Sequence, residues 1–519
     1  MRRADAFCIR VPAISSRDGS DAMAAKRTLS LGLLRRIWVV AAAGFFGLAW
    51  APPAQALPSF ARQTGQPCGT CHTDFPALTP YGRRFKLLGY TVGGGMFRTT
   101  PFSPAADNVR AEAAKMGLYL KAAKAPANDD KDYVPPVALM AIIGYTHTQA
   151  DLAPPTDPWK PNDNIVISPV SGFWGGAIAD NIGAFAQVTY NAPGPGGFSD
   201  PFGHTWTWDN TDVRFVKTAH IGGIDAIFGL TANNNPTVQD VWNTTPAWAF
   251  PYAVSTVAST PATKTTIEGA FSAHVVGFGA YAYIADLLYL EATLYRTLDF
   301  GAQNSLGVDP YGAGGLIDGV SPYWRLALEP HWNNNYLMVG TFGSQTNVHN
   351  WINPGTGDTS TFAQTDKFTD IGFDAQYQYQ GDNYWLTLRG SYIHEFQQLD
   401  STFSQGGSAN LNNDVNSLHL QASFAYGLDN RIVLTGQYFN VWGSSDPILY
   451  SGLASGFSPN SDGFIAEIAY IPFSASKAPG WPWGNVRIGL DYTFYNKFDG
   501  TTVGASANNT LFLHLWFAM

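Results

Sequence analysis

Residues 510–519 read TLFLHLWFAM, and apolar side chains occupy every second position along them. Successive side chains of a β-strand point to opposite faces, so these apolar residues would share one face. That face would carry Leu511, Leu513, Leu515, Phe517 and Met519. The opposite face would be mixed, with Thr510, Phe512, His514 and Trp516. An apolar row toward lipid and a mixed row toward the lumen are typical of strands in a transmembrane β-barrel.

The same alternation recurs upstream, in segments of strand length separated by Gly, Asn, Asp and Pro. Sixteen such segments span about 383 residues, or about 24 residues for each strand with its loop, and an even count is usual in bacterial barrels. A soluble β-sandwich or β-propeller is the alternative, but no repeat of blade length occurs. The strands are expected to begin near Val137, Ile165, Ile182, Asp212, Ile224, Val275, Leu287, Tyr323, Tyr336, Phe368, Tyr384, Leu418, Arg431, Gly463, Val486 and Thr510.

Composition agrees with a membrane barrel. Aromatic residues make up 14% and charged residues only 13% of the 519 residues, about half the usual charged share. Beyond residue 56, no run reaches the roughly 18 uninterrupted apolar residues that a membrane-spanning helix needs. The predicted fold class is therefore all-β: a transmembrane antiparallel β-barrel of about 16 strands with a small N-terminal α-helical module.

The N-terminus has the pattern of a secretory signal peptide. Basic residues, ending with Arg35 and Arg36, precede an apolar run over 37–50, and Ala54-Gln55-Ala56 is a small-x-small cleavage pattern. Residues 1–56 are expected to be removed, with Met23 as an alternative start and an uncleaved anchor as the competing interpretation. Eight of the 30 Lys/Arg and three of the 39 Asp/Glu lie there, so 22 and 36 remain and the net charge becomes −14. That balance argues against nucleic acid as a partner and favours cations.

Cys68-Gly69-Thr70-Cys71-His72 is the most specific motif in the chain. Cys-x-x-Cys-His is the attachment signature of c-type haem. Two thiols on one short helical turn can each reach the same porphyrin, and the adjacent His can bind its iron. Cys68 and Cys71 are thus predicted to carry one haem c, with His72 as the proximal ligand. A thioredoxin-like pair would need a βαβ context, and a zinc site would need further ligands at short spacing.

The second axial ligand of the iron is left open by the sequence. Met96, in the glycine-rich stretch after the motif, is the candidate distal ligand. Met116, Met140 and His147 follow it, and an open distal site is a further alternative.

The residues after the motif are expected to form a short helix. Thr79 is a candidate N-cap, Pro80 suits the first helical position and Gly89 suits the stop. Phe85 and Leu88 would share a face that could cover the haem. Guanidinium groups match carboxylates, so Arg62 and Arg83 are candidate partners for the haem propionates. Arg84 and Lys86 are alternatives, and a merely solvated basic face is the competing interpretation.

These features divide the chain into four parts: signal peptide 1–56, monohaem cytochrome c module 57–96, linker or plug-like extension 97–134, and barrel 135–519. An Asn-rich, aromatic segment over 231–248 could fold into the lumen or against the haem module, although an ordinary surface loop is the commoner outcome. No phosphate-binding loop, HExxH motif or catalytic triad can be argued, so no catalytic residues are predicted.

Residues 57–65, LPSFARQTG, followed at once by the Cys-x-x-Cys-His motif and by LTPYGRRFK over 78–86, resemble the fused monohaem cytochrome c–porin family, which includes outer-membrane iron oxidases. The resemblance implies a location in the bacterial outer membrane, in contact with its lipid, with the haem module at or near the periplasmic side or within the barrel. It also implies electron transfer from an extracellular donor, ferrous iron, through one haem to a periplasmic carrier such as a cytochrome or a copper protein. The alternatives are a solute-conducting porin with a haem gate or sensor, exchange with a different external donor or acceptor, and, more distantly, a peroxidase-like enzyme.

Overall fold

The structure, a computed structural model, describes residues 58–64, 66–91, 136–152, 159–179, 181–190, 192, 204–245, 249–271, 274–309, 314–350, 359, 364–427, 431–453, 457–475 and 481–519. All of them belong to one compact unit, Pro53–Met519. The predicted signal peptide, the candidate ligand Met96 and the linker over 97–134 lie outside the described residues.

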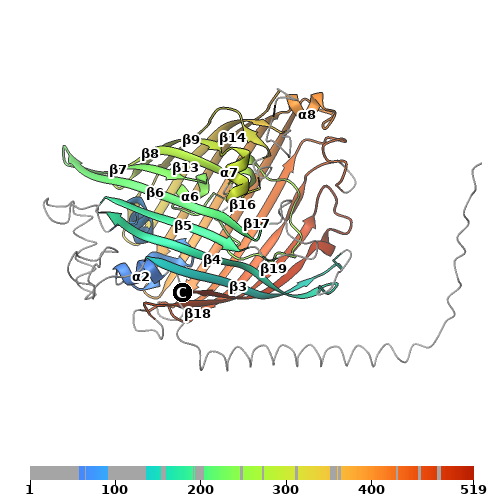
Figure 1. Ribbon diagram of the computed structural model, residues 1–519. Helices are drawn as coiled ribbons and strands as arrows, with labels where there is room; N and C mark the ends of the chain where they lie inside the picture. The colour runs from blue at the N-terminus through green and yellow to red at the C-terminus, as the bar shows by residue number, and fades with distance from the viewer. Residues whose placement is uncertain are drawn as a thin grey trace, which may run out of the picture. The chain divides into compact units, whose positions relative to one another are not determined.

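Sixteen long strands of the described residues form a closed antiparallel barrel (Figure 1). Neighbours along the chain pair with each other, and β20 pairs with β3, so the sheet has no free edge in the membrane. The predicted fold class and strand count are confirmed. The strands are β3(Val137–Thr148), β4(Asp163–Ala179), β5(Ile182–Tyr190), β6(Trp206–Ile221), β7(Ile224–Asn233), β8(Val275–Ile284), β9(Leu288–Thr297), β11(Ser321–Leu328), β13(Asn335–His349), β14(Asp366–Gln380), β15(Tyr384–Gln398), β16(Asn412–Tyr426), β17(Arg431–Gly443), β18(Ser461–Ile471), β19(Asn485–Lys497) and β20(Thr510–Ala518).

Shorter elements complete the described fold. The two-residue strands β10(Leu316–Ile317) and β12(His331–Trp332) extend the barrel sheet, whereas β1(His72–Asp74) and β2(Ala77–Leu78) form a separate pair. The helices are α2(Pro58–Thr64), α3(Cys68–Cys71), α4(Pro80–Leu87), α6(Pro236–Gln239), η4(Thr266–Ala270), α7(Phe300–Ser305), α8(Asp400–Ser404) and η5(Ala505–Asn508). None of the helices in the described part of the chain is long and apolar enough to cross a bilayer.

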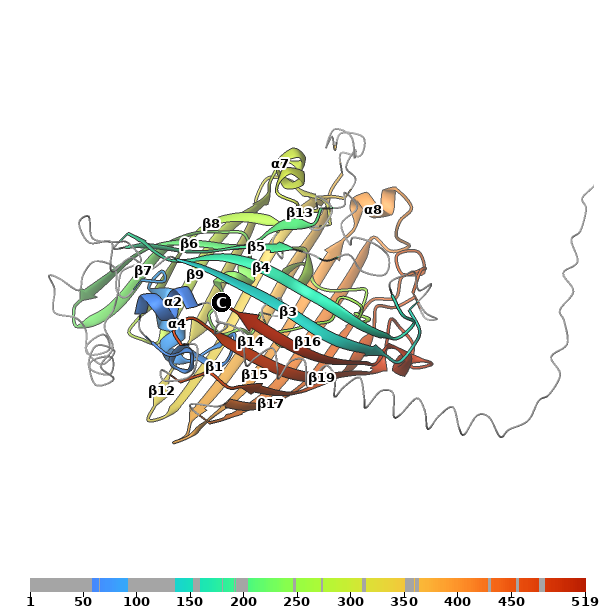
Figure 2. The ribbon, with the colours of Figure 1, turned by 60° about the horizontal axis from the view of Figure 1, so that its bottom comes forward.

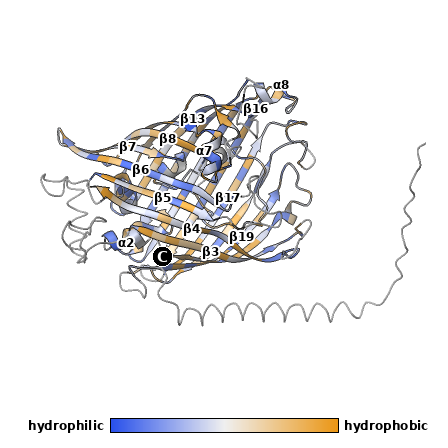
Figure 3. Ribbon diagram, in the orientation of Figure 1, coloured by the Kyte–Doolittle hydropathy of each residue, from blue (hydrophilic) through white to orange (hydrophobic). Residues whose placement is uncertain are grey.

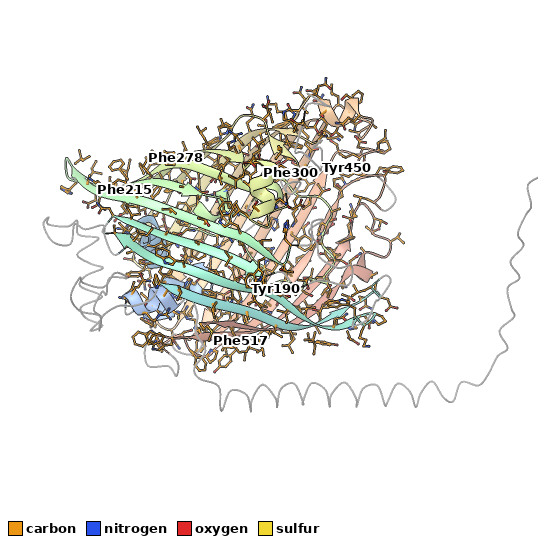
Figure 4. The ribbon with its side chains drawn as sticks, in the orientation of Figure 1. Tyr190, Phe215, Phe278, Phe300, Tyr450 and Phe517 are labelled. Carbon is orange, nitrogen blue, oxygen red and sulfur yellow. The ribbon has the colours of Figure 1, made fainter. Side chains whose placement is uncertain are left out.

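Side chains alternate across the barrel wall as the sequence pattern predicts. Hydrophobic and hydrophilic residues follow each other along single strands (Figure 3). The outward positions are apolar and exposed: Ile165 is 67% and Phe278 is 65% exposed. Figure 4 labels Phe278 and Phe215 among these outward residues. Inward positions are often buried and charged, such as Arg325 and Glu395. An apolar outer surface on a closed barrel places the protein in a bacterial outer membrane.

The two ends of the barrel differ in the length of their connections. At the end where β3 begins, most neighbouring strands are joined by a few residues, as between Ile221 and Ile224. At the opposite end the connections are long, and the one between β7 and β8 runs over 234–274. Bacterial barrels keep short turns in the periplasm and long loops outside the cell. The end where β3 begins is therefore the periplasmic end.

The helix after the cysteine motif forms as predicted. The Thr79 side chain caps α4 by accepting a hydrogen bond from the Gly82 N–H at 3.1 Å, and Pro80 is its first residue. Gly89 adopts a left-handed φ of 68°, and the N–H of Tyr90 bonds to the Phe85 carbonyl at 3.1 Å, which ends the helix. The predicted helix boundaries are confirmed.

Candidate functional site

The cysteine motif lies against a cavity of about 310 Å³ at the periplasmic end of the barrel. Figure 2 shows α2, α4 and β1 beside the barrel strands at that end. Three parts of the chain supply its walls: the N-terminal module, the inner faces of β3, β4, β5, β6 and β20, and the connection between β7 and β8. Most of the lining is apolar. The lining residues from the module include Phe60, Cys68, Cys71, His72, Phe75, Phe85 and Tyr90, and those from the rest of the chain include Met140, Phe173, Phe185, Tyr252 and Trp516.

Cys68 and Cys71 are the ends of the single-turn helix α3, and both are free cysteines that line the cavity. Gly82 lets α4 pack directly on this turn, because a Cβ at Gly82 would lie 2.2 Å from the Cys71 carbonyl oxygen. Burial raises the pKa of Cys68 and, more strongly, raises the pKa of Cys71 to about 12. Both groups are therefore neutral thiols at neutral pH.

His72 leaves α3 in an extended conformation and presents its ring to the same cavity. Its Nδ1 lies 3.1 Å from the Pro76 carbonyl oxygen, so Nδ1 carries the proton and Nε2 is the ring nitrogen with a free lone pair. Burial lowers the pKa of His72 to about 4, which keeps the imidazole neutral. A neutral ring, fixed by a carbonyl at its other nitrogen, is the usual arrangement of a histidine that binds a metal.

Two barrel arginines hold the motif in place. Arg431, at the start of β17, donates hydrogen bonds to the carbonyl groups of His72, Thr73 and Gly69, at 2.7 Å to Thr73 and 3.1 Å to Gly69. Arg487 of β19 forms an ion pair with Asp74. Neither arginine could be found from the sequence, because each lies more than 350 positions from the motif.

The predicted propionate partners are already engaged with the barrel and do not line the cavity. Arg83 forms an ion pair with Glu329 and donates a hydrogen bond to Gln378 at 2.6 Å. Arg62 donates to the Val137 carbonyl and lies over the Trp483 ring at 4.9 Å. Of the alternatives, Arg84 pairs with Asp286, whereas Lys86 lines the cavity. Lys86 also donates to the Asp240 carbonyl at 3.0 Å.

Of the described candidate axial ligands, one lies at the cavity and one does not. Met140 lines the cavity from β3, whereas His147, further along the same strand, pairs with Asp163 at 2.8 Å on an exposed surface. Met96 and Met116 lie outside the described residues. Of the two residues expected to cover a haem, Phe85 lines the cavity, but Leu88 packs against a different cluster that includes Leu87.

The segment expected over 231–248 is not a surface loop: its first residues end β7, and the chain then enters the barrel. Asp240 accepts hydrogen bonds from the N–H groups of Trp242 and Thr244 at 2.8 and 2.9 Å. Arg325 of the wall lies 3.7 Å from Asp240 and 5.0 Å from the centre of the Trp242 ring. Burial raises the pKa of Asp240, but Arg325 and the backbone N–H groups outweigh it and hold this pKa below its usual range. The described residues of 234–271 are hereafter called the lumen segment.

Lys86 gives the packing of the module a pH dependence. Burial, aided by the positive charge of Arg214, lowers the pKa of Lys86 to about 8. Between pH 8 and 10.5 the unfolded chain therefore binds more protons than the folded one, so stability rises with pH across this window. The gain expected from one such group is on the order of 3 kcal/mol. Denaturant unfolding of the detergent-solubilised protein between pH 7 and 10.5 should show this rise, and Lys86→Met should abolish it; equal slopes in both proteins would contradict the assignment.

No family model and no curated protein matches this chain. Among solved structures, the chain is similar to OprB of Pseudomonas putida, at 12% identity and a TM-score of 0.43 over 74% of this chain and 92% of that one. It is similar to OmpF of Salmonella typhi in complex with daunomycin, at 13% identity and a TM-score of 0.41 over 74% and 97%. It is also similar to OmpT of Vibrio cholerae, at 10% identity and a TM-score of 0.38 over 74% and 98%.

Proposed function

We propose that this outer-membrane barrel is a c-type cytochrome–porin fusion that transfers electrons from an extracellular donor, ferrous iron, to a periplasmic carrier. The observation that carries the proposal is the convergence of Cys68, Cys71 and the His72 ring on one largely apolar cavity inside the periplasmic end of the barrel. The motif alone would be a pattern match. Here the two thiols and the His72 ring line one cavity, and Nδ1 of His72 lies 3.1 Å from the Pro76 carbonyl oxygen, so all three groups could contact one bound molecule.

The residues present fit a covalently attached haem. Cys68 and Cys71 would form its thioether bonds, and Nε2 of His72 would bind its iron. When bound, the haem would accept and release one electron at a time. Met140 lines the same cavity, and its thioether would be a further group able to hold the iron.

The protein around the cavity supports this role in three ways. Aromatic side chains pack around the site, with Phe75 at 4.9 Å from the His72 ring and 5.1 Å from the Trp516 ring. Arg431 and Arg487 fix the motif to the wall. The apolar band of such barrels is about 25 Å tall, so a redox group inside the periplasmic end lies closer to an external donor than a carrier free in the periplasm does.

The test is anaerobic addition of ferrous iron to the purified protein in detergent, followed by its visible spectrum. We expect the oxidised haem bands to convert to the reduced form at a pH near that of the cell's surroundings. A haem that stays oxidised over this range would overturn ferrous iron as the donor, and a colourless protein would overturn the whole proposal.

Solute conduction is a second candidate, because sixteen-stranded barrels can enclose an aqueous channel. In this chain the module and the lumen segment both occupy the interior, which favours a narrow or closed lumen. Liposome swelling with small sugars discriminates the two functions. Solute flux equal to that of an open porin, unchanged by loss of the haem, would favour the conducting function.

A further inference from the structure

Three potential metal ligands meet on the inner wall of the barrel beside the motif. Glu467 of β18 and Asp491 of β19 are direct cross-strand partners, and His514 of β20 pairs with Gly489, two positions from Asp491. All three side chains are buried. One ligand atom from each lies within 4.8 Å of the others, which is close enough for one ion to contact all three.

His514 has ring nitrogens that the protein does not satisfy. Its side chain is fully buried, and neither Nδ1 nor Nε2 has a hydrogen bond among the described residues. Nδ1 is nevertheless 2.9 Å from Oδ2 of Asp491, which likewise lacks a hydrogen bond. Buried polar atoms without a partner are rare, and an ion absent from the structure is a recognised reason for them.

Because Gly489 has no side chain, the His514 ring and the Glu467 carboxylate can both lie over its Cα. A Cβ on Gly489 would lie 2.5 Å from Nε2 of His514 and 2.9 Å from Oε1 of Glu467. The unpartnered nitrogen and a carboxylate oxygen therefore approach the same point on the wall. Any larger residue at position 489 would force them away from it.

Arg487 orients the Glu467 carboxylate by hydrogen bonds. It donates to both oxygens of Glu467, at 2.6 Å to Oε2 and 3.3 Å to Oε1, and also pairs with Asp74. Hydrogen-bonded carboxylates of this kind are typical around metal sites. Asp74, Glu467 and Asp491 bring three carboxyl groups together beside two guanidinium groups, those of Arg487 and the nearby Arg431.

We propose that Glu467, Asp491 and His514 form a binding site for a divalent first-row transition-metal ion. Two carboxylates and one imidazole suit manganese and iron better than soft, thiolate-preferring ions. That the ion in the cell is ferrous iron rests on the proposed function; the metal site itself does not. His514 is two residues from Trp516 on the same face of β20, and Trp516 contacts Phe75, which contacts His72. The rings of Trp516 and Phe75 thus connect the proposed metal site to the motif.

The test uses Mn²⁺, which has a spectroscopic signal and is not oxidised by a ferric haem. The haem-loaded protein in detergent is titrated with Mn²⁺, and the free ion is followed by electron paramagnetic resonance. We expect one tight site per chain, from which anaerobic ferrous iron displaces Mn²⁺, since ferrous iron binds N/O ligands more tightly. His514→Gln and Asp491→Asn should each weaken this site at least 10-fold.

The matched controls are His220→Gln and Asp225→Asn, which alter an exposed His–Asp pair at 2.7 Å on β6 and β7. These should leave the tight site unchanged, and heat-modifiable gel mobility should show that every variant is folded. Absence of a tight Mn²⁺ site in the wild type, or equal binding by the cluster variants and wild type, would overturn the inference. Haem reduction by ferrous iron in a protein that lacks a tight Mn²⁺ site would overturn this inference alone. A wild-type protein that binds Mn²⁺ at this site but is exported without haem would overturn the proposed function alone.

Discussion

Replacing both Cys68 and Cys71 by Ala is expected to remove all covalently bound haem from the exported protein. The two thiols line the same cavity, and no other cysteine of the described chain could substitute for them. Haem staining after denaturing electrophoresis, with the pyridine haemochrome spectrum of the purified protein, measures the loss. The barrel should still form, because its wall is held by strand pairing that does not involve the motif.

Single variants sharpen this result. Cys68→Ala or Cys71→Ala leaves one thiol on α3, so any haem retained should have one thioether bond and a shifted haemochrome band. His220→Gln, on the exposed surface, should keep full haem content. Haem that remains covalently bound in the double variant would show that the motif is not the attachment site.

Replacing Arg325 by Ala is expected to release the lumen segment from the wall. The Arg325 guanidinium pairs with Asp374 of β14 and lies 3.7 Å from Asp240, and all three side chains are fully buried. Removing one partner of a buried ion pair costs about 3–5 kcal/mol, because the other charge stays buried and uncompensated. We expect this cost to be relieved by movement of the segment, which should raise single-channel conductance in planar bilayers several-fold.

The double variant Arg325→Ala, Asp374→Asn tests whether uncompensated charge is the cause. Removing the charge at position 374 should recover part of the lost stability, so the two substitutions should not be additive. Arg296→Ala, on an exposed position of β9, is the matched control and should leave conductance unchanged. Unchanged conductance in Arg325→Ala would mean that the segment is held by other contacts.

The barrel could be predicted from the sequence because lipid imposes a period-two pattern on each strand. Fourteen of the sixteen strands begin within two residues of their predicted starts. The exceptions are β6, which begins at Trp206 instead of Asp212, and β16, which begins at Asn412 instead of Leu418. Both extensions lie at the loop end. In β16 the polar residues Asn412 and Asp414 replace the outward apolar row there. Beyond the lipid, the pattern that marks a strand is lost although its backbone pairing continues.

The local parts of the candidate site were predictable, and its long-range contacts were not. The cysteine motif and the Thr79 cap depend on a few neighbouring residues, and both are found where the sequence places them. Arg83 is an example. The prediction that it binds a haem propionate required its guanidinium to be unpaired, but Glu329, 246 positions away in the sequence, forms an ion pair with it. The path of the lumen segment likewise depends on Arg325, and no local pattern in the segment encodes that contact.

Electron transfer across a sealed membrane is the most direct measurement of the proposed function. The protein is reconstituted into liposomes that enclose an oxidised soluble cytochrome, and ferrous iron is added outside under anaerobic conditions. We expect the enclosed cytochrome to be reduced in vesicles with wild-type protein and not in vesicles with the Cys68→Ala, Cys71→Ala variant. No reduction with a haem-loaded wild type, or an equal rate with the variant, would contradict electron transfer through this barrel.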